Sequence, residues 1–120
     1  MIHVFRLDKI HFDKVKDGTK TVEMRLYDEK RKHLRVGDQI LFRERDNELN
    51  KVRTIIRKIE VYKNFNELYG FYNKVALGYD ENQEANPKDM EKYYPIEKQN
   101  EFGVVAITIE LDKTLDKFGF

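Results

Sequence analysis

Residues 18–25 of this chain are Gly-Thr-Lys-Thr-Val-Glu-Met-Arg, and residues 36–38 are Val-Gly-Asp. Gly18 is the type of residue that commonly ends a helix, because it adopts the left-handed conformation without steric penalty. Directly after it, residues 21–27 alternate strictly between apolar and polar side chains, which is the pattern of a half-buried strand. The stretch therefore predicts a helix that ends at Gly18 and a strand that follows at once.

The two faces of this predicted strand differ in chemistry. Its apolar face consists of Val22, Met24 and Leu26, and its polar face of Thr21, Glu23, Arg25 and Tyr27. Lys20 lies at the start of the strand, beside the polar face. A lysine, a glutamate and an arginine together can bind a polar ligand that carries phosphate.

Length and composition indicate one domain with a heavily charged surface. The chain has 120 residues, of which 40% are hydrophobic and 38% charged, and its formal net charge is only +1. Balanced charge argues against a large, uniformly basic surface for duplex DNA, but a local basic groove remains compatible with it. The absence of cysteine excludes disulfides and thiol nucleophiles. No secretory signal or membrane span is predicted, so we expect a cytoplasmic protein.

The order of the remaining segments predicts the fold class. Further strands are expected at residues 2–7, 39–45, 51–62 and 102–111, with a bulge or bend at Ile55 and Ile56 in the longest one. Short helices are expected after Asp8, after Asn64 and after Asn86. The prediction is an α+β domain over residues 1–111, with a curled sheet of about five strands, and a C-terminal tail without pattern over residues 112–120.

These motifs, taken in order, resemble the ASCH domain, a branch of the PUA-like β-barrel superfamily. The resemblance is carried by residues 16–25 and by residues 36–42, Val-Gly-Asp-Gln-Ile-Leu-Phe. It continues in residues 65–68, in the pair Tyr93-Tyr94 and in the closing residues 102–107. It implies a small barrel with a cleft beside the motif strand, expected to bind RNA or a nucleotide-like ligand.

The resemblance also implies a set of catalytic residues, and this chain differs from that set at one position. Some small relatives hydrolyse modified cytidines or cleave RNA. In the amidohydrolase relatives, a lysine and a threonine three residues later act as catalytic residues, together with a glutamate from later in the chain. Lys20 matches that lysine, but Glu23 stands at the position of the nucleophilic threonine. Thr21 is next to Lys20 and does not occupy the nucleophile's position, so a binding module is favoured over an enzyme.

The candidate ligand-binding residues are Lys20, Thr21, Glu23, Arg25 and Tyr94. In a cleft, Arg25 can present its planar fork to phosphate or a base edge, while Glu23 accepts from an amine or holds the arginine in place. From spacing alone, Glu23 and Arg25 would be an ordinary surface ion pair. Tyr94 precedes Pro95, which ends a helix and can leave the ring exposed for stacking on a base.

A dense basic segment follows the motif strand and is the candidate rim of a nucleic-acid groove. The cations concerned are Lys30, Arg31, Lys32 and Arg35. A solvated loop is the alternative interpretation. The three histidines lack the spacing of metal ligands, so neither a metal site nor a cofactor is predicted.

Three functions remain open from the sequence. The first is an RNA- or nucleotide-binding module without catalysis, and it is the one we favour. The second is an enzyme that hydrolyses a modified nucleoside or cleaves RNA, with Glu23 as general base and Lys20 as electrostatic stabiliser. The third is a protein-interaction module whose cleft takes an acidic peptide or a partner protein, and whose tail, ending in Phe118-Gly119-Phe120, could mediate self-association. The sequence does not predict the oligomeric state.

Overall fold

A computed structural model of the chain describes residues 1–113. Its strands are β1 (Ile2–Leu7), β2 (Val22–Leu26), β3 (Gln39–Glu44), β4 (Asn47–Tyr62) and β5 (Val104–Leu111). Its helices are α1 (Lys9–Asp17), α2 (Phe65–Leu68), α3 (Lys74–Leu77), the 3₁₀ helix η1 (Pro87–Lys92) and α4 (Ile96–Phe102). The expected α+β fold with a curled five-stranded sheet and short helices is confirmed. The expected tail falls largely on residues 114–120, Phe118 and Phe120 included, which lie outside the described residues.

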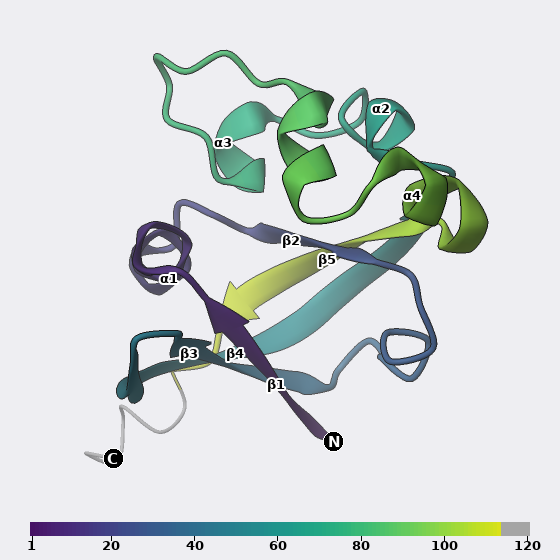
Figure 1. Ribbon diagram of the computed structural model, residues 1–120. Helices are drawn as coiled ribbons and strands as arrows, with labels where there is room; N and C mark the ends of the chain where they lie inside the picture. Colours follow the sequence, from purple (N-terminus) through teal and green to yellow (C-terminus); the bar gives the residue numbers. More distant parts are fainter. Residues whose placement is uncertain (114–120) are drawn as a thin grey trace.

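The five strands form one sheet in the order β1-β3-β4-β5-β2. β1 pairs parallel with β3, whereas the β3–β4, β4–β5 and β5–β2 pairs are antiparallel. β1 and β2 are therefore the two edges of the sheet. The long strands β4 and β5 curl, so that β1 and β2 approach each other across the open side of a half-barrel (Figure 1).

A register shift between Ile56 and Lys58 marks the bend in β4. The sequence predicted it at Ile55 and Ile56, one residue too early, because only the change of alternation reveals it. A second shift, between Arg43 and Glu44 in β3, lies beside the hairpin into β4. Such bulges increase the local twist and let a small sheet close on itself.

The short helices gather on one side of the sheet, over β2 and β5, while α1 covers one end of it (Figure 1). Two apolar clusters result. One fills the inside of the curled sheet around Phe12, Ile40, Phe42 and Ile107. The other joins the outer face of β2 to the helices through Met24, Phe65 and Leu68, among others. β2 thus lies between two apolar layers.

Burial on both sides of β2 corrects the expected half-buried strand. Val22, Glu23, Met24 and Leu26 are all buried, and only Arg25 has intermediate exposure. The alternation itself is right, because the apolar side chains of the strand face the helices. Its polar side chains, however, face the inside of the curled sheet and not open solvent.

The residues that cap the helices are those predicted from the sequence, with one exception. Gly18 has φ of 87° and ends α1, and the side chains of Asn64 and Asn86 accept backbone N–H groups at the starts of α2 and η1, as predicted. Asp8 makes no capping hydrogen bond and instead pairs with Arg45 at 2.9 Å. Helices α3 and α4 were not predicted, since each is at most two turns long.

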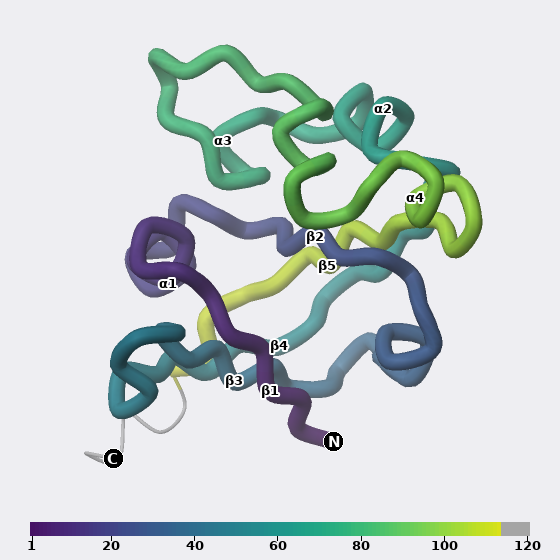
Figure 2. The backbone as a smooth tube through the Cα atoms, in the orientation of Figure 1, coloured from purple at the N-terminus to yellow at the C-terminus, as the bar shows by residue number. Residues whose placement is uncertain are grey.

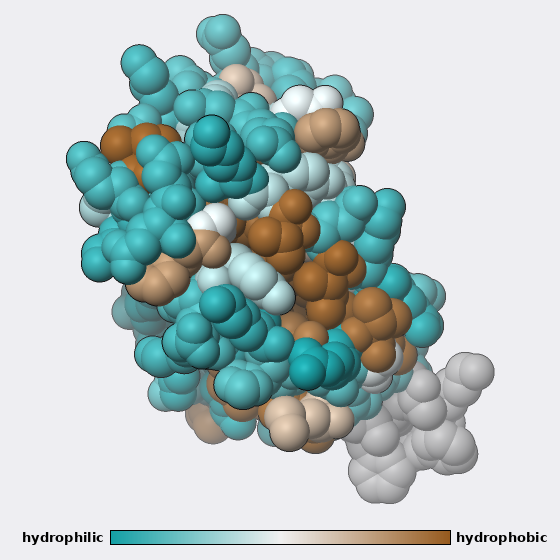
Figure 3. Space-filling view, turned by 90° about the vertical axis from the view of Figure 1, so that its right-hand side faces the viewer, coloured by the Kyte–Doolittle hydropathy of each residue, from teal (hydrophilic) through white to brown (hydrophobic). Residues whose placement is uncertain are grey.

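The surface reflects the high content of charge. The side of the molecule in Figure 3 is hydrophilic over most of its area, with a strip of hydrophobic residues across its middle. Among the described residues, no helix combines the length and the apolar character needed to cross a membrane.

Candidate functional site

The residues after α1 are positioned by the end of that helix. Gly18 turns the chain, and the Lys20 amide then donates to the carbonyl of Lys14 at 3.0 Å. Two residues later β2 begins, with Glu23 paired to Ile107 of β5 and Arg25 paired to Val105. Both β5 partners are fully buried in the inner cluster. The motif therefore places three ionisable side chains against the core of the half-barrel.

These three side chains form a buried ionic triad, Lys20–Glu23–Arg25. The Lys20 Nζ lies 3.0 Å from Glu23 Oε1, and the Arg25 Nη2 lies 2.8 Å from Glu23 Oε2. The Arg25 Nε also donates to Glu23 Oε2 at 2.9 Å. Lys20 is only 5% exposed and Glu23 only 2%. A lysine and a glutamate are almost never buried to this extent unless they are paired, and here they are paired with each other.

The Glu23 carboxylate uses its whole acceptor capacity inside the protein. Besides the bonds from Lys20 and Arg25, Oε1 accepts the backbone N–H of Met24 at 3.3 Å. An ionised carboxylate has about four lone-pair sites, and four donors approach this one. Glu23 thus holds the two cations in place and has no lone pair left for a ligand.

The electrostatics of the triad keep Glu23 ionised. Burial opposes the charged form, but the cations of Lys20 and Arg25 outweigh it and lower the pKa of Glu23 to about 2. Burial likewise works against the charge of Arg25, yet Glu23, followed by Tyr94, raises the pKa of its guanidinium. The triad therefore carries two positive charges and one negative charge at neutral pH.

Arg25 also connects the two edges of the sheet. Its Nη2 donates to the backbone carbonyl of Arg6 in β1 at 3.3 Å. Its guanidinium carbon lies 4.5 Å from the centre of the Phe5 ring, a cation–π contact. One side chain thus spans the opening between β2 and β1.

His11 extends the network from α1. Its Nδ1 lies 3.3 Å from the Lys20 Nζ. Burial and the charge of Lys20 lower the pKa of His11 to about 4, so the ring is neutral at pH 7. Because Nδ1 accepts from an ammonium group, the ring proton is on Nε2, which is available as a donor.

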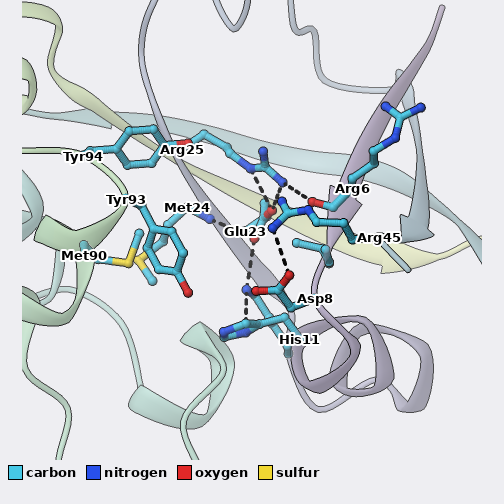
Figure 4. A pocket seen from close by; sticks show the side chains of 12 residues that line it. Arg6, Asp8, His11, Glu23, Met24, Arg25, Arg45, Met90, Tyr93 and Tyr94 are labelled. Carbon is cyan, nitrogen blue, oxygen red and sulfur yellow. Dashed lines mark hydrogen bonds and ion pairs between the residues drawn. The ribbon is translucent and has the colours of Figure 1, made fainter. Parts of the chain in front are cut away.

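A cavity of about 130 Å³ opens beside the triad. Its walls combine cations, acids, aromatic rings and apolar side chains. They are formed by Arg6, Leu7, Asp8, His11, Lys20, Glu23, Met24, Arg25, Arg45, Met90, Tyr93 and Tyr94. Figure 4 shows Glu23 between Arg25 and His11, with Tyr93 and Met90 across from them. The cavity lies where the two edges of the sheet approach each other under η1.

Comparison with known proteins identifies the fold around this cavity. The sequence model of the ASCH domain matches residues 7–113. The chain belongs to the ASCH domain family. The resemblance inferred from the sequence is therefore confirmed, and the fold is PUA-like. The comparison with curated proteins found no match.

Several solved structures share this fold over nearly the whole chain. The crystal structure of hypothetical protein PH0355 is 28% identical, with a TM-score of 0.78, and the match covers 93% of this chain and 100% of that one. The solution structure of protein PF0455 from Pyrococcus furiosus is 26% identical, with a TM-score of 0.69 and coverage of 92% and 97%. The crystal structure of ASCH from Zymomonas mobilis is 14% identical, with a TM-score of 0.62, and covers 91% of this chain and 66% of that one.

The predicted ligand-binding residues of this ASCH domain are only partly brought together. Lys20, Glu23, Arg25 and Tyr94 all line the cavity. Thr21 does not, although alternation put it on the face of Glu23. Its amide donates to the carbonyl of Ala76 and its carbonyl accepts from Ile109, and it lines a separate hollow beside β5.

Tyr94 is less exposed than its place before Pro95 suggested. Its ring stacks on Phe65, with ring centres 6.1 Å apart, and belongs to the helical apolar cluster. The exposed ring of the pair is Tyr93, which is 46% exposed. Tyr94 therefore presents its hydroxyl edge to the site, beside Arg25, while Tyr93 offers an open ring face.

The predicted basic rim lies elsewhere, in the loop between β2 and β3. This loop and α1 lie at opposite ends of β2 (Figure 2), and none of the four rim cations lines the cavity. Arg31 pairs with Asp28 at 2.8 Å and Lys32 with Glu29 at 3.3 Å. Arg35 donates to two backbone carbonyls of the same loop, and Lys30 is exposed. The solvated-loop interpretation describes these residues better than a rim does.

Two other arginines occupy the mouth of the cavity, and sequence reasoning missed them. Arg6 is the next-to-last residue of β1 and Arg45 follows β3, and both side chains are about half exposed. They lie together because β1 and β3 run parallel, so that their carboxyl ends meet at one edge. The parallel pairing was the missing information, since each arginine alone looks like an ordinary surface residue.

A metal centre finds no support among residues 1–113. No group of three or more histidine or acidic side chains gathers there in a way that could hold an ion. His11 is engaged by Lys20, and Glu23 is engaged by both cations of the triad.

Proposed function

We propose that this ASCH domain is a binding module for RNA or a nucleotide-like ligand, and that the cavity beside the ionic triad takes one base. The proposal is carried by one observation: a buried triad with an excess of positive charge lines a cavity that has an open aromatic face. Three features of the cavity support it, namely its charge, its size and its mouth.

The charge of the inner wall favours a ligand rich in hydrogen-bond acceptors. Glu23 is saturated, whereas the Lys20 ammonium has three donors, of which Glu23 and His11 use two. Arg25 directs its Nε and Nη2 to Glu23 and Arg6, and its guanidinium also hydrogen-bonds to the side chain of Tyr94 at the cavity wall. An anion or the carbonyl edge of a base would compensate the buried positive charge.

The size of the cavity fits one planar ring. At about 130 Å³ it is close to cavities of about 150 Å³ that bind benzene. Tyr93 and the two methionines in its wall provide the apolar faces on which a base stacks. A whole nucleotide would leave its sugar and phosphate outside.

The mouth of the cavity suits that phosphate. Arg6 and Arg45 are half exposed and paired with Glu48 and Asp8 at the surface. Exposed ion pairs of this kind contribute only about 0–1 kcal/mol, so the arginines can exchange their carboxylate partners for a phosphate at little loss.

Hydrolysis is the less well supported alternative. The pKa of Glu23 is lowered to about 2 and its lone pairs are occupied, both of which oppose a role as general base. No serine or threonine is among the residues that line the cavity, and the chain has no cysteine, so a nucleophile of the usual kind is missing there. Lys20 and Glu23 are thus proposed as binding and positioning residues.

Binding to short single-stranded RNA tests the proposal. Replacing Arg6 and Arg45 together by alanine should weaken binding about tenfold or more and reduce its dependence on salt, because two phosphate contacts are lost. Arg57→Ala is the matched control, since Arg57 is an exposed arginine paired with Glu110 away from the cavity. Titration by fluorescence anisotropy at several salt concentrations measures both effects.

Equal affinity in the double variant and in Arg57→Ala would contradict the assignment of the mouth. Turnover of acylated cytidine or of the RNA itself by the wild-type protein would instead favour the hydrolytic alternative.

A further inference from the structure

A second hollow, of about 280 Å³, lies next to the cavity. The two share four lining residues, His11, Met24, Met90 and Tyr93. Because the same side chains bound both hollows, the two are neighbouring halves of one groove between α1 and η1. The arginine-lined mouth belongs to the first half only.

The second half of the groove has its own cations and polar groups. Lys14 donates to the carbonyl of Gly78 at 2.7 Å and pairs with Asp80 at 3.0 Å. Lys92 is exposed at the end of η1, with its Nζ 5.1 Å from the centre of the Tyr93 ring. Gln83 and Tyr79 add donors and acceptors to the same wall. This half therefore resembles the first in combining cations and a carboxylate, that of Asp89, with aromatic surface.

The border between the halves suits the backbone that would link two nucleotides. Tyr93 lines both hollows and is 46% exposed, and since Lys92 lies over one face of its ring, the ring offers its other face and its edge for contact with a base. His11 also lines both, and its Nε2–H can donate to a phosphate oxygen placed at the border. Lys20 is next to it.

We propose that the groove is a two-subsite platform for single-stranded RNA, in which adjacent nucleotides occupy the two hollows and their linking phosphate lies over His11. This inference rests on the proposed function and deepens it. A dinucleotide is then the smallest ligand that occupies both halves of the groove.

Binding measured with two sets of probes tests the inference. The probes are the four ribonucleoside 5′-monophosphates and the four homodinucleotides that carry a 5′-phosphate. The best dinucleotide should bind about tenfold or more tightly than its monophosphate, since the second base and phosphate add contacts. Isothermal titration calorimetry gives both dissociation constants for the full chain.

Two variants close or weaken the second hollow without touching the first. Ile10 is 69% exposed and lines only the second hollow, so Ile10→Glu places a negative charge there on a surface helix. Lys92→Ala removes the exposed cation. Each should weaken dinucleotide binding about threefold to tenfold and leave monophosphate binding unchanged.

Each variant has a matched control in the chain. Val36→Glu adds the same charge at an apolar residue that is 62% exposed and lies in the loop before β3. Lys88→Ala removes an exposed lysine from the same helix as Lys92, and Lys88 lines neither hollow. Both controls should bind dinucleotides like the wild type.

The outcomes separate this inference from the proposed function. If monophosphates bind and dinucleotides bind no more tightly, the second subsite is wrong and the base cavity stands. If dinucleotides gain affinity but Ile10→Glu and Lys92→Ala behave like their controls, the gain comes from elsewhere and the inference also fails. If neither probe binds, the proposed function itself is overturned.

Discussion

Glu23 is the residue on which the geometry of the cavity depends. It is the single anion between Lys20 and Arg25, and its carboxylate orients both of them. Removing one partner of a buried ionic group costs more than the pair contributes, because the remaining charges are left without compensation. If Glu23 positions Lys20 and Arg25, its replacement should therefore lower the free energy of unfolding markedly.

We expect Glu23→Gln to destabilise the protein by about 3 kcal/mol at pH 7. The pH dependence identifies the cause. The pKa of Glu23 is about 2 in the folded protein, below its ordinary value of 4.5. Its ionisation therefore stabilises the fold above pH 4.5, and this contribution is lost as the pH falls toward 2. Urea denaturation of both proteins at pH 7 and at pH 3 measures the difference.

The gap in stability between wild type and Glu23→Gln should narrow at pH 3. A constant gap at both pH values would mean that the carboxylate charge is not the stabilising feature. His11 also destabilises the wild type in acid, since its pKa of about 4 lies below 6.5. Because the charge of Glu23 raises the pKa of His11, this acid destabilisation is larger in Glu23→Gln and works against the narrowing.

Helix α3 contributes to the site through the glycine that ends it. Gly78 has φ of 112°, and a Cβ added there would lie 3.2 Å from His11 Nδ1 and 3.2 Å from Lys20 Cδ. The C-terminus of this short helix thus packs directly against the His11–Lys20 contact. No sequence pattern indicated this, because α3 is only four residues long.

Gly78→Ala should therefore disturb the site as well as the fold. The strain of a positive φ costs about 1–3 kcal/mol, and the added methyl group forces the His11 ring and the Lys20 side chain to shift slightly, which loosens the packing around His11. With less burial, the pKa of His11 should rise from about 4 toward its ordinary value of 6.5. Titration of the histidine ring signals by NMR measures it.

Gly37→Ala is the control for strain alone. Gly37 has φ of 94° with nothing within 4 Å of an added Cβ, so this variant should lose stability without changing the pKa of His11. Equal His11 pKa values in both variants would contradict the packing role of Gly78.

The elements also indicate what a sequence can and cannot predict. The α1–β2 unit was predictable because Gly18 and the alternation after it are local signals. The bulge in β4 and the caps at Asn64 and Asn86 were predictable for the same reason. The burial of Glu23 was not, since it depends on β5 lying beside β2 and on β1 approaching from the other edge.

The cavity mouth was unpredictable for a related reason. Arg6 and Arg45 are 39 positions apart, and only the parallel β1–β3 pairing brings them together. Local charge density pointed instead to residues 30–35, where carboxylates and carbonyls of the same loop engage most of the cations. In this chain, the spacing of charges identified Lys20, Glu23 and Arg25. The parallel β1–β3 pairing decided which other cations line the same cavity.

The whole molecule is a half-barrel whose opening is bridged by the site itself. Within residues 1–113, β1 pairs as a strand with β3 alone, and its other side faces Arg25 of β2. The cation–π contact with Phe5 and the bond to the Arg6 carbonyl add to that single pairing. The closure of the sheet and the ligand contact that we propose for Arg25 therefore use the same guanidinium.

Arg25→Met should loosen β1 selectively. Methionine keeps an apolar chain against Phe5 but loses the hydrogen bond to Arg6 and the charge. We expect the amides of β1 to exchange with solvent about tenfold faster relative to those of β5, the size of effect that one net hydrogen bond produces. Hydrogen exchange under native conditions measures this effect. The ratio of β1 to β5 exchange rates is used, because a global loss of stability speeds exchange in both strands and cancels in the ratio.

Arg57→Met is the matched control, because Arg57 bridges β4 to β5 through an exposed pair with Glu110 at 2.8 Å and lies away from the opening. Its β1 to β5 ratio should equal that of the wild type. If Arg25→Met gives this same ratio, the two edges are held together by packing alone, and a ligand could occupy Arg25 without any effect on β1. If the ratio rises only in Arg25→Met, a ligand that takes donors from Arg25 should raise it as well, which links occupation of the cavity to the opening of the sheet.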